Sequence, residues 1–237
     1  MLATAGAVDS GTIDGIVVQH LALHNANTAL IAGIVRRTFD DLTRLFGPSA
    51  GPPPAIVETA SYEVDDMTLP ISSAGNLVAV PERLAWLHDA RNPLARDWLN
   101  FVLGREIARR WWGRCLAAPV GPGAMLVDEG MPMLIGLQRI AATDGLPAAD
   151  RYADILRDRM TRQRAGFDGP ATAPEQADDE PYAPLQGGLA LYERWRRNPH
   201  ATDALLDRTA RHARCEEGRV TLADPSQLSA AVRHGRR

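Results

Sequence analysis

The chain contains no lysine. Its 26 basic residues are all arginine, and with 29 acidic residues they give a formal net charge of −3. A balance so close to neutral creates no strong attraction for a polyanion, so we expect no nucleic-acid partner. The densest basic segment consists of Arg194, Arg196 and Arg197 around Trp195. We interpret it as a solvated helix face rather than a phosphate-binding patch.

Cysteine is scarce. Cys115 and Cys215 are the only two in 237 residues, and they lack any C-x-x-C spacing. This excludes a disulfide-rich scaffold and a cysteine-based zinc module. The sequence leaves open whether the two cysteines pair with each other.

Long apolar runs are also missing. The first residues, MLATAGAVDSGTIDG, have no basic region followed by an apolar stretch, so they do not read as a signal peptide. No segment approaches the roughly 20 apolar residues that span a bilayer. On these grounds we expect a cytoplasmic chain that does not insert into a membrane.

The hydrophobic pattern predicts a small amount of β-structure followed by helices. We expect short strands at residues 16–19, 55–57 and 77–80, and helices at about 25–46, 92–112, 124–140, 148–164, 185–197, 201–214 and from 225 onward. Asn25 or Asn27 can cap the first helix, and Asn92 the second. Pro132 should kink the third.

These elements predict one domain after a loose lead-in at residues 1–15. Residues 16–237 form this domain, with a sheet-containing part at 16–90 and a helical part at 91–237. Residues 165–181 are rich in proline, glycine and aspartate, which predicts a mobile loop inside the helical part.

The most informative segment is GREIARRWWG, residues 104–113, followed by Asp128-Glu129-Gly130. Residues four apart on a helix lie on one face, so two histidines at that spacing can share a zinc ion. A glutamate after the first histidine can then act as general base, and a glutamate from the next helix can be the third ligand.

The segment resembles the signature of the aminopeptidase N-type zinc metallopeptidases, the thermolysin-like gluzincins. In that signature H-E-x-x-H is followed by Q-W-W-G and then by a distant glutamate in an N-E-G or S-E context. The resemblance places Arg105 and Arg109 at the two histidine positions, Glu106 at the base position and Glu129 at the third-ligand position. The gap between Arg109 and Glu129 resembles the branch found as domains attached to ABC-transporter permeases.

Three other segments resemble the same family in the same order. They are FDDLTRLFGP at residues 39–48, AGNLVAVPE at 74–82 and PYAPLQGGLALY at 181–192, so the likeness covers residues 16–197. It implies an α+β, mostly helical fold: a thermolysin-like peptidase catalytic domain with a small mixed β-sheet and a helical lobe.

The departures from the family pattern fall on the chemistry. Arginine offers no lone pair, so Arg105 and Arg109 cannot bind zinc. The tyrosine that stabilises the oxyanion in the family aligns with Pro184. The Gly-Ala-Met-Glu-Asn segment that reads a free amino group is missing, and residues 74–76 are Ala-Gly-Asn. We therefore expect no cofactor, with zinc only if a rearranged site exists.

The same residues also have simpler interpretations. R-E-x-x-R alone is a common salt-bridged surface pattern on helices. Glu106 is either a vestigial base or, as we favour, an ion-pair partner of an arginine. Because Glu129 and Glu106 would otherwise be close carboxylates without a counter-charge, we predict that Glu129 pairs with Arg109 or Arg105.

Aromatic and histidine side chains give no second site. Trp98, Trp111 and Trp112 favour core packing over a stacking platform. His20 and His24 are four residues apart, but they fall at a strand-to-helix junction without evident acidic ligands, so we do not favour a metal there.

The sequence thus predicts a catalytically degenerate aminopeptidase N-like domain, a pseudoenzyme that serves as a binding or structural module. Its partner could be a peptide, an ABC-transporter permease or another domain of a longer parent, and in a membrane-attached parent the domain would be extracytoplasmic. Arg105 and Arg109 are the candidate contacts for a small anion or a peptide carboxylate. The alternative is an active zinc metallo-aminopeptidase acting on peptide N-termini.

Overall fold

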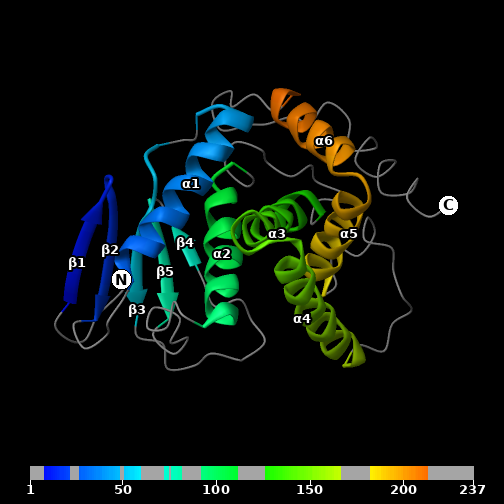
Figure 1. Cartoon of the computed structure of the whole chain (residues 1–237), viewed down its shortest axis with the longest axis horizontal. Coiled ribbons are helices and arrows are strands. Elements are labelled where there is room, and N and C mark those ends of the chain that lie inside the picture. Colours follow the sequence, from blue (N-terminus) through cyan, green and yellow to red (C-terminus); the bar gives the residue numbers. More distant parts are fainter. Residues whose placement is uncertain are drawn as a thin grey trace.

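The fold places a small β-sheet on one side and a helical lobe on the other, with α1 lying across the sheet (Figure 1). A computed structural model of the chain describes residues 8–21, 27–48, 51–59, 72–74, 76–81, 92–111, 126–166 and 182–212. This mostly helical α+β arrangement with a small mixed sheet is the class that the sequence predicted.

The sheet has five strands in the order β1-β2-β3-β5-β4. Its strands are β1 (Val8–Ile13), β2 (Ile16–Leu21), β3 (Ala55–Thr59), β4 (Ser72–Ala74) and β5 (Leu77–Pro81). The two edge strands pair antiparallel with their neighbours, whereas β2, β3 and β5 run parallel. Burial of Ile16, Val18, Ile56 and Val78 fixes which side of the central strands faces the core.

The interpretation of residues 1–15 as a loose lead-in is wrong for residues 8–13, which form strand β1. Asp9, Ser10 and Thr12 are exposed, so the strand has no apolar alternation by which to recognise it. The signal that was available is the Asp14-Gly15 pair, which has φ values of 50° and 75° and connects β1 to β2. Two central residues with positive φ suit a tight hairpin, and Asp-Gly is a preferred sequence for it.

Helix α1 (Thr28–Phe46) begins directly after Asn27, one of the two residues proposed as its cap. The Asn27 side chain accepts a hydrogen bond from the Leu30 amide at 3.0 Å. The helix ends before Gly47, whose φ of 77° most other residues avoid. Its apolar face, including Ile31, Ile34 and Val35, is buried.

The helical lobe begins with α2 (Pro93–Ala108), capped by Asn92 as predicted. After the π-helical turn η2 (Leu126–Gly130) come α3 (Met131–Asp144), α4 (Leu146–Ala165), α5 (Ala183–Arg197) and α6 (Pro199–His212). The expected kink at Pro132 does not occur inside a helix. Pro132 lies in the first turn of α3, where its missing N–H breaks no intrahelical hydrogen bond.

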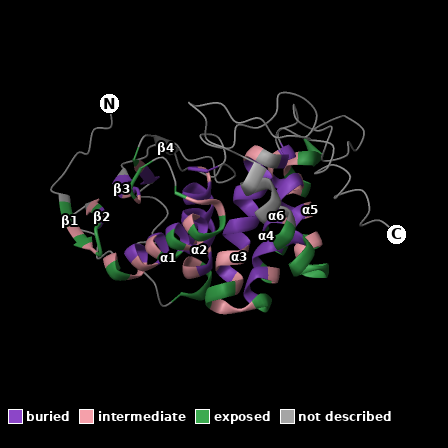
Figure 2. Cartoon of the chain, turned by 90° about the horizontal axis from the view of Figure 1, so that it is seen from above, coloured by how far each residue is buried: buried purple, intermediate pink, exposed green. Residues whose placement is uncertain are grey.

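Most residues of α2 and α3 are buried where these two helices pack against each other (Figure 2). A Cβ on Gly136 would lie 2.5 Å from the carbonyl oxygen of Phe101, and one on Gly104 would lie 3.1 Å from the Cα of Gly136. The two glycines therefore let the helix backbones approach closely. This crossing sets the position of the helix that carries Arg105, Glu106 and Arg109.

Several expectations lie outside the described residues: Trp112, Cys115, Cys215, His24, most of the 165–181 loop and the helix from residue 225. Within the described part of the chain, no helix has the length and apolarity to cross a membrane.

Candidate functional site

The candidate site forms where the C-terminal end of α2 meets η2. Arg105 and Glu106 lie in the last turn of α2, and Arg109 is the residue that ends it. Glu129 lies in η2, next to Gly130. A Cβ on Gly130 would be 3.1 Å from the backbone of Gly187 in α5, so a glycine at this position lets η2 pack closely against α5.

Glu129 is bound by both arginines. Its Oε1 accepts a hydrogen bond from Arg109 Nη2 at 2.5 Å, and its Oε2 accepts one from Arg105 Nη2. The prediction that Glu129 pairs with one arginine or the other is therefore confirmed, with both. Since each guanidinium donates to a different oxygen, neither arginine substitutes for the other.

Glu106 joins the same cluster. Arg105 Nη1 donates to Glu106 Oε1, and Arg109 Nη1 lies 3.7 Å from that oxygen. The ion-pair interpretation that we favoured for Glu106 is thus what the geometry shows. Together Arg105, Glu106, Arg109 and Glu129 form what we call the Arg–Glu cluster, with two positive and two negative charges.

The Arg–Glu cluster is largely withdrawn from water. The Glu106 side chain is fully buried, those of Arg105 and Glu129 are 9% and 11% exposed, and Arg109 is 32% exposed. Charges in such surroundings are tolerated when they are paired and hydrogen-bonded. The pairing of opposite charges therefore offsets part of the cost of removing these groups from water.

Asp128 lies beside the Arg–Glu cluster, and the family signature implies no role for it. Burial, and next the negative charge of Glu129, raise the pKa of the Asp128 carboxyl, while Arg109 opposes the shift. Its adjacency to Glu129 in the sequence was the signal that could have drawn attention to it. Because Asp128 is acidic, it gives the site no further positive charge with which to bind an anion.

The residues of this site do not fit a zinc ion. Both positions that need a nitrogen lone pair carry guanidinium groups, which only donate hydrogen bonds. Both oxygens of Glu129 already accept from these groups. Among the described residues, no group of three histidine, cysteine, aspartate or glutamate side chains is arranged to hold a metal.

The tryptophan of the motif serves packing. Trp111 is buried, its ring centroid lies 5.4 Å from that of Phe39, and its Nε1 donates to the Gly47 carbonyl at 3.1 Å. Trp98 packs partly buried against the core. The core interpretation is therefore confirmed for Trp111, whose contacts also join the 39–48 segment to the end of α2.

The remaining predicted positions lie on other elements. Pro184 is in the first turn of α5. Asn76 precedes β5, and its side chain donates to the Pro53 carbonyl at 3.3 Å. His20 lies in β2, paired in register with Asp9.

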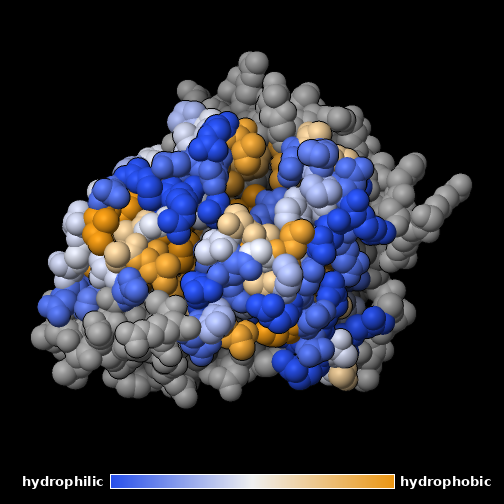
Figure 3. All heavy atoms as spheres, in the orientation of Figure 1, coloured by the Kyte–Doolittle hydropathy of each residue, from blue (hydrophilic) through white to orange (hydrophobic). Residues whose placement is uncertain are grey.

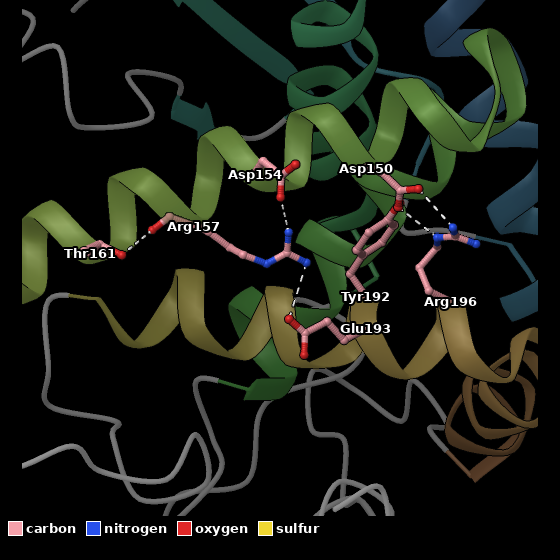
Figure 4. Close-up of polar contacts among 7 residues, drawn as sticks. All are labelled: Asp150, Asp154, Arg157, Thr161, Tyr192, Glu193 and Arg196. Atoms are coloured by element: carbon pink, nitrogen blue, oxygen red, sulfur yellow. Dashed lines mark hydrogen bonds and ion pairs between the residues drawn. The ribbon is translucent and has the colours of Figure 1, made fainter.

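A separate pocket of about 380 Å³ lies between α4 and α5 (Figure 4). Arg196 donates to both oxygens of Asp150 at 2.8 and 2.9 Å, and Tyr192 donates to the same carboxylate at 2.8 Å. Arg157 pairs with Asp154 on α4. Hydrophilic residues are numerous over the helical lobe in Figure 3, with hydrophobic ones between them. Because Arg196 is already paired, the arginine segment agrees better with a solvated helix face than with a phosphate patch.

Comparison with known proteins identifies the fold. No family model matches the chain, and no curated protein matches it. Among solved structures, the M1 zinc metallopeptidase of Deinococcus radiodurans matches with a TM-score of 0.55 at 15% identity, over 96% of this chain and 48% of that one. Leukotriene A4 hydrolase of yeast, in complex with bestatin, matches with a TM-score of 0.65 at 15% identity, over 97% of this chain and 36% of that one.

The chain therefore has the fold found in M1 zinc metallopeptidases, and it spans less than half of the length of these matched proteins. An identity of 15% carries the fold and no activity. The function of this chain therefore depends on the residues and geometry of its own site.

Proposed function

We propose that this chain is a catalytically degenerate aminopeptidase N-like domain that acts as a binding or structural module. The observation that carries the proposal is the Arg–Glu cluster, because guanidinium groups are paired with Glu129 at the positions where the resemblance expects zinc-binding histidines. In this proposal the arginine charge has taken over the part of the metal in balancing Glu129.

The other parts of peptidase chemistry support the same proposal. Metal-assisted hydrolysis needs an open coordination position and a base next to the bound water. Glu106 occupies the base position, but its carboxylate accepts from Arg105 and is fully buried. Pro184 has no hydroxyl with which to stabilise an oxyanion.

The proposed partner is a peptide, an ABC-transporter permease or another domain of a longer parent. Arg105 and Arg109 are the proposed contacts for a small anion or a peptide carboxylate. Since the cluster has no surplus positive charge, such a ligand would have to displace Glu129 from Arg109, the more exposed of the two arginines. Binding of a peptide library to the unmodified chain and to the Arg109→Gln variant would test this contact.

The direct test of lost catalysis uses the purified full chain. We expect no stoichiometric zinc by elemental analysis, even after incubation with zinc, and no hydrolysis of aminoacyl-anilide substrates. An activity that a chelator abolishes, zinc restores and Glu106→Gln removes would overturn the proposal and favour the active metallo-aminopeptidase.

A further inference from the structure

The pocket between α4 and α5 has hydrogen-bonding groups that the protein itself leaves unused. Its volume of about 380 Å³ is in the range of small-ligand sites, and it shares no residue with the Arg–Glu cluster. Its lining is almost entirely charged and comes from both helices: Asp150, Arg157, Tyr192, Glu193, Arg196 and Arg197. In Figure 4 the Tyr192 ring lies between Arg157 on one side and Arg196 on the other.

The Asp150 end of the pocket is already paired. The carboxylate accepts from Arg196 Nε and Nη2 at 2.8 and 2.9 Å, and from the Tyr192 hydroxyl at 2.8 Å. The hydrogen bond from Arg196 outweighs burial and lowers the pKa of the Asp150 carboxyl below its ordinary value. Asp150 therefore fixes the orientation of Arg196. The remaining Nη1 of Arg196 has no partner among the described residues.

Glu193 is the loosely held carboxylate of the pocket. Among the residues that the structure describes, its side chain accepts one hydrogen bond, from Arg157 Nη2 to Oε1 at the long distance of 3.4 Å. Arg157 makes its closer contact with Asp154 on its own helix. Since the Glu193 side chain is 51% exposed, a ligand can reach it. Its carboxylate can thus accept further hydrogen bonds.

The charges around the pocket balance. Three guanidinium groups and three carboxylates surround it: Arg157, Arg196 and Arg197, against Asp150, Glu193 and the Asp154 that pairs with Arg157. A phosphate would meet repulsion as well as attraction, and so would a polycation. An open carboxylate and an open guanidinium donor in one pocket instead match a ligand that carries both charges.

We propose that this pocket binds a small zwitterion of the amino-acid type, whose ammonium group donates to Glu193 and whose carboxylate accepts from Arg196 Nη1. Glu193 and Arg196 are three residues apart on α5, so their Cβ atoms lie about 5–6 Å apart on one face of the helix. An ammonium group and a carboxylate on the same carbon can bridge two such side chains. The ligand gains two charge-assisted hydrogen bonds while Arg196 stays paired with Asp150.

The test compares three probes on the full chain by NMR titration of the backbone amides at neutral pH. L-alanine carries both charges, N-acetyl-L-alanine keeps only the carboxylate, and L-alanine amide keeps only the ammonium group. We expect saturable binding of L-alanine, with shifts at residues 150–157 and 193–197. Each of the other two probes loses one charge-assisted hydrogen bond, so it should bind about tenfold more weakly.

Variants separate the two ends of the ligand. Glu193→Gln changes an exposed side chain, so the fold should persist, and it should weaken L-alanine about tenfold while leaving N-acetyl-L-alanine unchanged. Asp158→Asn is the matched control, because it removes the same charge from an exposed side chain of α4 outside the pocket. Arg196→Lys keeps a positive charge beside Asp150 but removes the planar fork, and it should weaken both L-alanine and N-acetyl-L-alanine.

The proposal is overturned if L-alanine shows no saturable binding, or if either singly charged probe binds as well as L-alanine. It is equally overturned if Glu193→Gln behaves like Asp158→Asn. Shifts confined to the surroundings of Arg105 and Arg109 would assign the ligand to the Arg–Glu cluster and exclude this pocket. The proposed loss of zinc chemistry is unaffected by any of these results, because the two sites share no residue.

Discussion

At the scale of residues, the chemistry of Arg105 and Arg109 limits what the site at the end of α2 can bind. A histidine nitrogen can donate a lone pair to a metal, whereas the guanidinium of arginine carries a permanent charge and only donates hydrogen bonds. With Arg105 and Arg109 in place, the carboxylate of Glu129 meets planar donor groups, each bound to one of its two oxygens. In the proposed function, this pairing balances the charge of Glu129 without a metal ion that could activate water.

This charge balance can be tested by removing one partner. Glu129→Ala leaves Arg105 and Arg109 facing each other without that carboxylate, and loss of one member of a buried pair typically costs ~3–5 kcal/mol. We expect a clear decrease in the melting temperature. Arg109→Leu combined with Glu129→Leu should cost less than the sum of the two single substitutions, because the double variant leaves no unpaired partner between these positions.

Asp154→Ala provides the comparison. It breaks an exposed ion pair with Arg157, for which ~0–1 kcal/mol is typical. Equal melting temperatures for Glu129→Ala and Asp154→Ala would show that the Arg–Glu cluster contributes no more than a surface pair.

At the scale of elements, α2 holds positions 105 and 109 at the four-residue spacing that the resemblance to the zinc motif implies. Positions 105 and 109 still lie one turn apart and both face Glu129. Since the backbone keeps this register, restoring the donors should restore the metal site without rebuilding the fold.

Arg105→His combined with Arg109→His should therefore bind zinc, with Glu129 as the third ligand. We expect one zinc per chain by elemental analysis and calorimetry, with hydrolysis remaining poor because Pro184 offers no hydroxyl. Adding Glu129→Ala to the double variant should weaken zinc binding strongly. A folded double variant that takes up no zinc at micromolar concentrations would show that the inferred correspondence with the zinc motif is wrong.

At the scale of the whole molecule, the glycine crossing of α2 and α3 positions both halves of the site. Gly104 and Gly136 let these helices approach until backbone touches backbone. Gly130 then allows η2 to enter next to α5, which brings Glu129 to the end of α2.

Gly136→Ala should consequently destabilise the whole domain. Its Cβ would lie 2.5 Å from the Phe101 carbonyl oxygen, which belongs to helix backbone and cannot rotate away. Overpacking of this kind costs roughly 1–3 kcal/mol, to be measured by urea unfolding.

Gly33→Ala in α1 is the matched control, because its nearest neighbour is the flexible end of Arg37 at 3.2 Å. It should be neutral or stabilise by up to about 1 kcal/mol through helix propensity. A Gly136→Ala variant as stable as Gly33→Ala would mean that the helices can separate without cost.

The sequence by itself determined the features that depend on local rules. Apolar periodicity and the caps Asn27 and Asn92 located α1 and α2 closely. The ordered motifs indicated an M1-like peptidase fold, and the chemistry of Arg105 and Arg109 excluded them as zinc ligands before any geometry was known.

Tertiary structure decided the features that depend on contacts between distant segments. Strand β1 is too polar to be recognised alone and forms because it pairs with β2. Pro132 lies in the first turn of α3 because the preceding residues 126–130 form the separate turn η2, which packs against α5. The double pairing of Glu129 arises only once η2 meets the end of α2, since no local pattern states which side chains two distant segments bring together.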